Sequence, residues 1–151
     1  MAEVLLETRG LSKFFKTAGG LLHAVEDVDL ALGAGRTLGV VGESGCGKST
    51  LGRTVLRLEK PSAGQVLFRG EDISALGRRQ LRSARRDMQM VFQDPYSSLD
   101  PRMTVFDLVA EPLREICRGL PRAQARERVL DTMELCGLPA EYADSYPHEL
   151  D

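Results

Sequence analysis

A run of glycines that ends in lysine and serine offers the most specific chemistry in this sequence. Gly42-Glu43-Ser44-Gly45-Cys46-Gly47-Lys48-Ser49 fits the pattern G-x-x-x-x-G-K-S, which is typical of loops that bind phosphate. Its glycines let the backbone bend, so that successive N–H groups point at phosphate oxygens. Lys48 adds a positive charge at the outer phosphates, and the Ser49 hydroxyl is a ligand for Mg²⁺. With Thr50 as a further phosphate contact, these residues predict a nucleotide site that takes Mg²⁺.

The segments on either side of the loop are expected to hold it between a strand and a helix. Residues 37–41 are apolar on both faces, which predicts a buried central strand. Residues 48–58 carry apolar side chains at 51, 55 and 58, a spacing that predicts one face of a helix. The N-terminal end of that helix would add a partial positive charge to the phosphate site.

The rest of the chain predicts an α/β fold behind an antiparallel layer. Residues 4–11 and 24–32 alternate in polarity as half-exposed strands do, and Gly33-Ala34-Gly35 follows them as a turn. Further along, we expect a short strand at 65–68, a charged helix at 77–86 and a second buried strand at 88–92. Because strands and helices interleave after residue 36, the α/β class is favoured.

Two more helices are expected in the C-terminal third. Thr104 followed three residues later by Asp107 is typical of a helix start. Pro121 predicts the first position of the next helix. That helix would place Ala125, Val129 and Met133 on one stripe and end near Gly137.

Composition and charge exclude several classes of protein. The 151 residues include 20 basic and 22 acidic side chains, a balance that argues against a nucleic-acid binder. We therefore interpret the arginines at 78, 79, 82, 85 and 86 as a solvated helix face. Apolar residues make up 42%, enough for a packed core. The three cysteines form no C-x-x-C pair and are expected to be buried, reduced thiols, and neither His23 nor His148 has metal-ligand spacing around it.

Three segments in order carry a resemblance to a known family. Residues 40–50 include the phosphate loop with its cysteine, residues 91–101 read V-F-Q-D-P-Y-S-S-L-D-P, and residues 145–150 read S-Y-P-H-E-L. They resemble the phosphate loop, the Q-loop region and the approach to the signature sequence of ABC transporter ATP-binding subunits in the dipeptide/oligopeptide (and nickel) importer subfamily. The resemblance covers nearly the whole chain. It implies a P-loop NTPase of the ABC ATPase type, with an N-terminal antiparallel β-layer and the start of a helical subdomain.

This resemblance assigns roles to individual residues. It implies that ATP and Mg²⁺ bind at residues 42–50, with Lys48 and Gln93 as the catalytic residues and Ser49 and Gln93 at the metal. Gln93 would sense the γ-phosphate and contact the transmembrane subunit. An amide suits that role, because it both donates and accepts hydrogen bonds. Phe15 matches the aromatic residue that stacks on adenine in this family. Phe14 lies next to it, and each of the two rings is also a candidate for the core.

The family also has parts that residues 1–151 do not contain. No run of four apolar residues is followed by Asp-Glu, and neither the signature sequence nor the histidine that should follow that Asp-Glu strand is present. We therefore expect residues 1–151 to be the N-terminal part of an ABC ATP-binding domain. Its sheet should be incomplete, and it should bind nucleotide while hydrolysing little of it.

The full protein is expected to couple ATP hydrolysis to the import of peptides or a similar small solute. The partners implied are transmembrane permease subunits, a second ATP-binding subunit and, indirectly, a solute-binding protein, at the cytoplasmic face of the bacterial inner membrane. Two alternatives stay open: a nucleotide-binding module without hydrolysis, and a small P-loop metabolite kinase. The kinase is disfavoured because its loop should lie close to the N-terminus.

Overall fold

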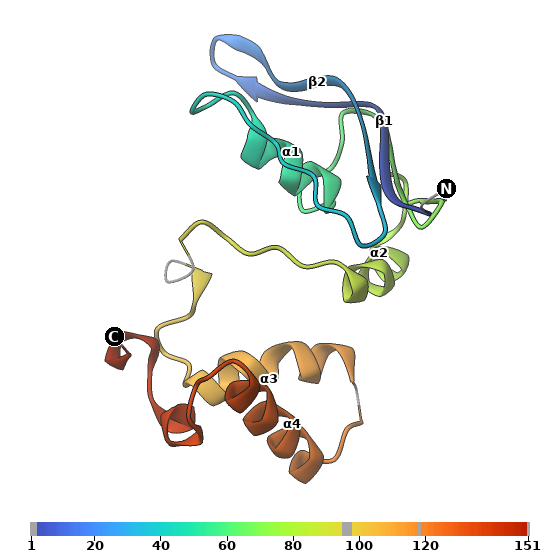
Figure 1. The fold of residues 1–151 in the computed structure, drawn as a ribbon. Coiled ribbons are helices and arrows are strands. Elements are labelled where there is room, and N and C mark those ends of the chain that lie inside the picture. The colour runs from blue at the N-terminus through green and yellow to red at the C-terminus, as the bar shows by residue number, and fades with distance from the viewer. Residues whose placement is uncertain (1–2, 95–97, 118, 151) are drawn as a thin grey trace. The chain divides into compact units, whose positions relative to one another are not determined.

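The structure, a computed structural model, describes residues 3–94, 98–117 and 119–150. They form two compact units, residues 1–90 and residues 91–151. In Figure 1 the first unit contains the strands β1 and β2 and the helices α1 and α2, and the second contains the helices α3 and α4. The predicted phosphate loop belongs to the first unit.

An antiparallel sheet forms the frame of the first unit. Strand β1 (Val4–Thr17) pairs with β2 (Gly20–Gly33) on one side and with β3 (Ala63–Phe68) on the other, and β3 pairs with the short β4 (Glu71–Asp72). The strand order is β2-β1-β3-β4. The predicted strands at 4–11, 24–32 and 65–68 are confirmed, with β1 extending six residues further than expected.

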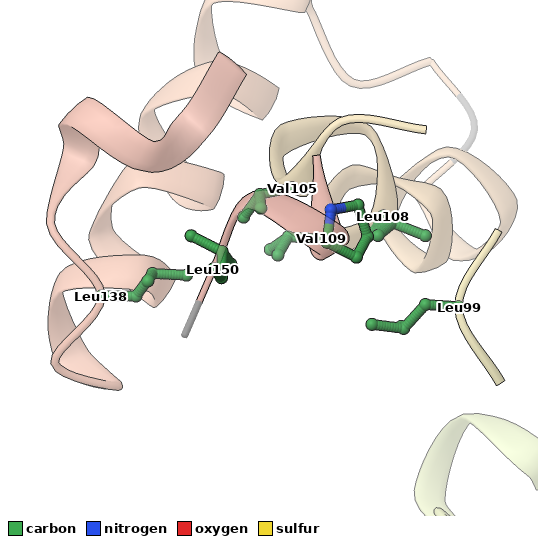
Figure 2. Close-up of a pocket in the computed structure, with 7 residues that line it drawn as sticks. Leu99, Val105, Leu108, Val109, Leu138 and Leu150 are labelled. Atoms are coloured by element: carbon green, nitrogen blue, oxygen red, sulfur yellow. The ribbon is translucent and has the colours of Figure 1, made fainter. Parts of the chain in front are cut away.

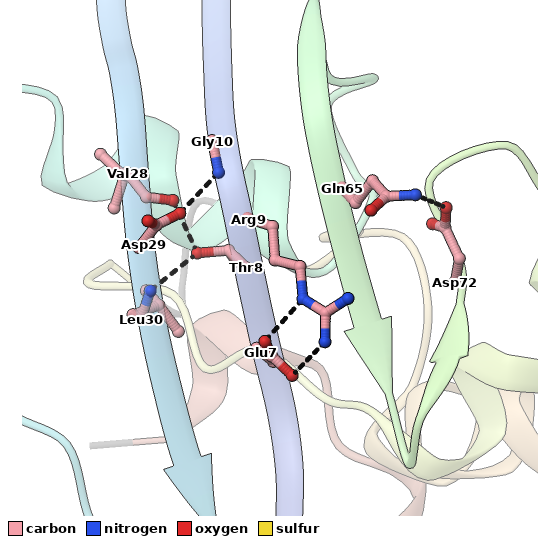
Figure 3. A network of polar contacts seen from close by, with 9 residues as sticks. All are labelled: Glu7, Thr8, Arg9, Gly10, Val28, Asp29, Leu30, Gln65 and Asp72. Carbon is pink, nitrogen blue, oxygen red and sulfur yellow. Dashed lines mark hydrogen bonds and ion pairs between the residues drawn. The ribbon is translucent and has the colours of Figure 1, made fainter.

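A buried hydroxyl and a carboxylate fix the register where β1 and β2 depart from regular pairing. Thr8 is 1% exposed, and its Oγ1 donates to the Val28 carbonyl at 2.8 Å and accepts from the Leu30 N–H at 3.1 Å. The Gly10 N–H donates to the Asp29 carboxylate at 2.6 Å, as Figure 3 shows. These contacts replace ladder hydrogen bonds lost between Thr8 and Leu11, so β1 and β2 stay joined where their register shifts.

Helix α1 (Lys48–Val55) packs on this sheet through a small apolar core. Its Val55 is buried with Leu11 of β1, Val66 of β3 and Ile73. The helix ends three residues before the predicted Leu58, because Arg57 adopts a left-handed conformation with φ 55°. The Arg57 side chain is buried, and its Nε donates to the Ile73 carbonyl at 2.9 Å. This bond ties the end of α1 to the residue that follows β4.

The predicted charged helix is present as α2 (Arg78–Ala84), which continues into the 3-10 turn η1 (Arg85–Asp87). The five arginines of this segment are all exposed. One of them, Arg85, donates from its guanidinium to the Arg57 carbonyl. The segment therefore closes over the end of α1 while most of its positive charge faces solvent.

The second unit is helical. It consists of α3 (Val105–Ile116), α4 (Arg122–Leu135) and the 3-10 turns η3 (Ala140–Asp144) and η4 (Pro147–Glu149). Its buried core contains residues from α3, α4 and η3: Val105, Ala110, Val129, Met133 and Ala143. Val129 and Met133 confirm the predicted stripe on α4, whereas Ala125 is only half-buried. Pro121 caps α4 instead of opening it as a helical residue.

The predicted start of α3 is confirmed in detail. Thr104 is the N-cap, and its Oγ1 accepts a hydrogen bond from the Asp107 N–H at 3.2 Å. The Asp107 carboxylate also accepts from Arg114 at 2.6 Å, and this hydrogen bond lowers the pKa of Asp107 below its ordinary value. The carboxylate therefore stays ionised near the positive end of α3, which stabilises the first turn.

Both predicted central strands are wrong as strands in this structure. Residues 37–41 and 88–92 have no regular structure, and Val41 and Val91 are 94% and 88% exposed. A buried strand needs neighbours that accept and donate its backbone hydrogen bonds. Among the described residues, the four-stranded sheet pairs with neither segment. The prediction of buried thiols is also wrong, since Cys46 and Cys136 are exposed and Cys117 is half-buried.

Replacing Thr104 with alanine should lower the free energy of unfolding by about 1 kcal/mol, because the Asp107 N–H loses its capping oxygen. Thr132→Ala is the matched control, since Thr132 lies inside α4 and its hydroxyl donates to the Arg128 carbonyl of the same helix. Urea denaturation followed by circular dichroism measures both variants. Equal midpoints for the two would contradict the capping role.

Candidate functional site

The phosphate loop lies against the hairpin through a contact that only glycine permits. Gly47 has φ 96°, and a Cβ built on it would lie 2.1 Å from the Ala24 carbonyl oxygen of β2. Gly45 also has a positive φ, of 81°, and a Cβ on Gly42 would lie 2.7 Å from the Cys46 sulfur. The glycines of the motif therefore have two roles. They let the backbone turn, and they allow close contacts with β2 and between residues of the loop.

Lys48 holds the loop from within. Its ammonium donates to the Gly42 carbonyl at 2.8 Å and to the Glu43 carbonyl, and it lies 3.6 Å from the Cys46 sulfur. These contacts bend the side chain back over its own loop. A phosphate that reaches the ammonium must compete with two neutral carbonyls, and a charged acceptor forms the stronger bond.

The start of α1 supplies further donors. The first hydrogen bond from this turn runs from the Leu51 N–H to the Gly47 carbonyl, so the preceding N–H groups have no intrahelical partner. Gly47 has no side chain to cap them, and the first turn of α1 carries no acidic residue. This end of the helix is therefore suited to an anion.

A cavity of about 340 Å³ brings this loop together with the hairpin. It is lined by residues of β1, β2, the loop and α1: Phe15, Leu22, His23, Ala24, Gly45, Cys46, Gly47, Lys48, Ser49 and Thr50. One wall is an aromatic ring and apolar strand residues, and another is a loop rich in N–H donors. This combination fits a ligand with a flat apolar part and an anionic part, and the Ser49 hydroxyl offers an oxygen for Mg²⁺ beside the anion.

The two adjacent phenylalanines have different environments. Phe15 lines the cavity, and the Lys13 ammonium lies 4.7 Å from its ring centroid. Lys13 is itself held by Glu59 at 3.1 Å and by the Lys60 carbonyl at 3.0 Å. Phe14 packs against His23, with ring centroids 4.4 Å apart. Of the two rings, Phe15 is the one in position to stack on a base.

The structure collects most of the predicted site residues, but not all of them. Gly42, Glu43 and Ser44 belong to the loop without lining the cavity, and two of them bind Lys48 through their carbonyls. Gln93 is an exposed residue of the second unit, in a segment without regular structure. Asp94 follows it, and three further residues of its motif, 95–97, lie outside the described residues.

Sequence reasoning missed three residues of the cavity wall: Leu22, His23 and Ala24. No motif marks them. The signal that could have found them is register, because pairing residues 4–17 with 20–33 as a hairpin places Leu22 opposite Phe15. An aromatic residue on one strand of a hairpin thus indicates its neighbours on the other.

The second unit has a cavity of a different character. Figure 2 shows Leu99, Val105, Leu108, Val109, Leu138 and Leu150 around a space of about 340 Å³, which Pro147 completes. All seven lining residues are apolar, so this space offers no side-chain partner for a phosphate.

In the part of the chain that the structure describes, no three residues among His, Cys, Asp and Glu lie close enough together to hold a metal ion. None of the helices in that part is long and apolar enough to cross a membrane.

Comparison with known proteins decides the family. The sequence model of a family described as ABC transporter matches residues 25–150. The chain belongs to the ABC transporter family. Solved structures agree with this assignment. The ATP-binding cassette MJ0796, in a dimeric post-hydrolysis state bound to ADP and Pi, superposes with a TM-score of 0.85 at 28% identity. That match covers 97% of this chain and 63% of the MJ0796 chain. CbiO1 of Clostridium perfringens, part of the ABC transporter complex CbiONQ, superposes with a TM-score of 0.75 at 26% identity. That match covers 99% of this chain and 56% of CbiO1.

Several curated relatives within the ABC transporter family are named as peptide-transport proteins. The oligopeptide transport ATP-binding protein OppF of Bacillus subtilis is 46% identical over 150 residues, which are 99% of this chain and 49% of OppF. The oligopeptide transport ATP-binding protein AppF of the same organism is 45% identical over 155 residues, covering 97% and 47%. A probable peptide ABC transporter ATP-binding protein of Sinorhizobium fredii is 46% identical over 157 residues, covering 99% and 44%. This chain therefore spans about half the length of the curated relatives it matches.

Replacing Gly47 with alanine should destabilise the chain by about 2 kcal/mol, because the new Cβ meets the Ala24 carbonyl and the left-handed backbone disfavours alanine. Gly52→Ala is the control within the same helix, where a Cβ meets no atom within 4 Å. It should be neutral or stabilise slightly. Urea midpoints measure both, and a Gly47→Ala variant as stable as wild type would show that the loop does not depend on this contact.

Proposed function

We propose that the cavity between the hairpin and the phosphate loop binds ATP with Mg²⁺. The observation that carries the proposal is that Phe15, from β1, lines the same cavity as residues 45–50. An aromatic face for a base and an N–H-rich loop for phosphates thus lie at one site, although about thirty residues separate them in sequence. The ADP and Pi named for the MJ0796 structure support the same ligand class.

Each predicted residue receives a role in this proposal. Phe15 stacks on adenine, and the backbone of residues 42–47 surrounds the phosphates. Lys48 exchanges its bonds to the Gly42 and Glu43 carbonyls for bonds to the outer phosphate oxygens. Ser49 and Gln93 hold Mg²⁺, which neutralises phosphate charge when bound, and Thr50 gives one more contact. Gln93 also senses the γ-phosphate and contacts the transmembrane subunit.

For the whole protein, we propose an ATP-binding subunit that couples ATP hydrolysis to import of peptides or a similar small solute. Residues 1–151 would be the N-terminal part of its ATP-binding domain, carrying the phosphate loop and the Q-loop. The peptide-transport roles for which OppF, AppF and the Sinorhizobium relative are named support peptides as the substrate class. A dimeric cassette among the structural neighbours supports pairing with a second ATP-binding subunit.

The remaining partners follow from this assignment. Such a subunit would dock on transmembrane permease subunits at the cytoplasmic face of the bacterial inner membrane, and a solute-binding protein would act through those permeases. The alternative is a nucleotide-binding module that does not hydrolyse ATP. The two differ in turnover, and they share the binding site.

Nucleotide binding is tested by equilibrium dialysis of ATP with Mg²⁺ against the chain. Lys48→Ala should weaken binding about 10-fold to 100-fold, because a charge-assisted bond to phosphate is lost. Lys60→Ala is the matched control, since Lys60 is exposed and does not line the cavity. Equal ATP affinity in wild type and Lys48→Ala would contradict the proposed site.

Hydrolysis is tested separately by phosphate release. Residues 1–151 alone should turn over little or no ATP, because the sequence has no Asp-Glu strand end to activate water. A longer protein that carries such a strand end should hydrolyse ATP and lose turnover in Gln93→Ala. Sustained turnover by residues 1–151 that disappears in Lys48→Ala would overturn this part of the proposal.

A further inference from the structure

The aromatic ring at the proposed base end of the cavity has a cation over one of its faces. The Lys13 ammonium lies over the Phe15 ring, 4.7 Å from the ring centroid. Phe15 lines the cavity beside the phosphate loop, whereas Lys13 is not among the residues that line it. The ammonium therefore covers the face of the ring that is turned away from the cavity, and the other face is left for a ligand.

The ammonium is held in this place by acceptors of the chain itself. The Lys13 side chain is 12% exposed, and its Nζ lies 3.1 Å from the Glu59 carboxylate and donates to the Lys60 carbonyl at 3.0 Å. An ammonium has three N–H groups, so these two acceptors engage two of them and the third is available to the ring. The negative charge of an aromatic face attracts a cation at this position.

The segment that carries these acceptors is joined to β1 on both sides of Lys13. The Ser62 N–H donates to the Ser12 carbonyl at 2.8 Å, and the Phe14 N–H donates to the Ser62 Oγ at 2.9 Å. Lys13 lies between these two bonds along the strand. The acceptors of its ammonium thus stay beside the strand that also carries the ring, so the arrangement is in place before a ligand binds.

We propose that Lys13 is a positioning residue for the base of the bound nucleotide, because it holds the Phe15 ring from behind while the open face of the ring meets the base. The inference rests on the proposed function, that ATP occupies this cavity with its base on Phe15. A ring that is fixed beforehand loses less conformational freedom when the base stacks on it, which strengthens binding. Lys13 contacts the ring and not the nucleotide, so its effect reaches the ligand only through Phe15.

The test compares ATP with inorganic tripolyphosphate, each with Mg²⁺, in equilibrium dialysis against the whole chain. Tripolyphosphate has phosphates and no base, so it reports on the phosphate loop alone. Lys13→Met keeps a long unbranched side chain and removes the charge. This variant should bind ATP about fivefold more weakly than wild type, the effect of one cation–π contact. It should bind tripolyphosphate as wild type does.

A double-variant comparison tests whether Lys13 acts through the ring. Phe15→Leu should weaken ATP binding, and adding Lys13→Met to it should weaken ATP binding no further, because the ring that transmits the effect is gone. Three results would each overturn the proposal: unchanged ATP affinity in Lys13→Met, an equal loss of tripolyphosphate affinity in that variant, or a fivefold loss that persists in the Phe15→Leu background.

Two further variants keep the result interpretable. Lys16→Met removes the same charge from an exposed position of the same strand, and it should bind both ligands as wild type does. Glu59→Gln leaves Lys13 in place without its carboxylate partner, and it should weaken ATP binding about twofold while tripolyphosphate binding stays the same. Equal ATP binding by Glu59→Gln and wild type counts against the proposal even if Lys13→Met does not fold.

Failure of this inference is distinguishable from failure of the proposed function. If Lys48→Ala weakens the binding of both ligands while Lys13→Met binds ATP as wild type does, the phosphate site stands and only the role of Lys13 is wrong. If Lys48→Ala binds ATP as wild type does, the nucleotide site itself is wrong.

Discussion

The approach of Gly47 to the Ala24 carbonyl is the constraint on which the site depends. A side chain at position 47 would push the loop away from β2, since its first carbon would lie 2.1 Å from that oxygen. Without a side chain there, the loop lies against the hairpin, and the residues before Ala24 become a wall of the loop's cavity. A motif known for holding phosphates thus also sets its own distance from the wall that β1 and β2 form on the other side of the cavity.

The other end of α1 is fixed by equally local means. Arg57 stops the helix with a left-handed turn and donates to the Ile73 carbonyl, and Arg85 donates to the carbonyl of Arg57. The apolar core formed by Leu11, Val55, Val66 and Ile73 lies between these polar ties and the loop. Helix α1 is therefore held at both ends and along one face, so its first turn points at a fixed place. A site that relies on N–H groups needs such rigidity, because backbone donors cannot reorient separately.

Local signals in the sequence predicted most of this architecture. The two strands of the hairpin, α1, the cap at Thr104 and the stripe at Val129 and Met133 all follow from patterns within a few residues of each other. The strands at 37–41 and 88–92 could not be settled in the same way. Apolar segments of this kind form buried strands only where neighbouring strands and helices cover them. The described residues provide no such neighbours for these two segments. The phosphate loop was recognisable from its glycines, whereas Leu22 is placed beside Phe15 in the cavity wall only by the register of β1 and β2.

The cavity has a further property that bears on how the chain folds. All of its lining residues, from Phe15 to Thr50, fall within the first fifty positions of the sequence. Contacts between near neighbours close short loops, which cost little entropy and form early. A ligand that binds such a cavity stabilises the arrangement by mass action as soon as it forms. Every residue that such a ligand contacts is therefore synthesised before the helices α2, α3 and α4.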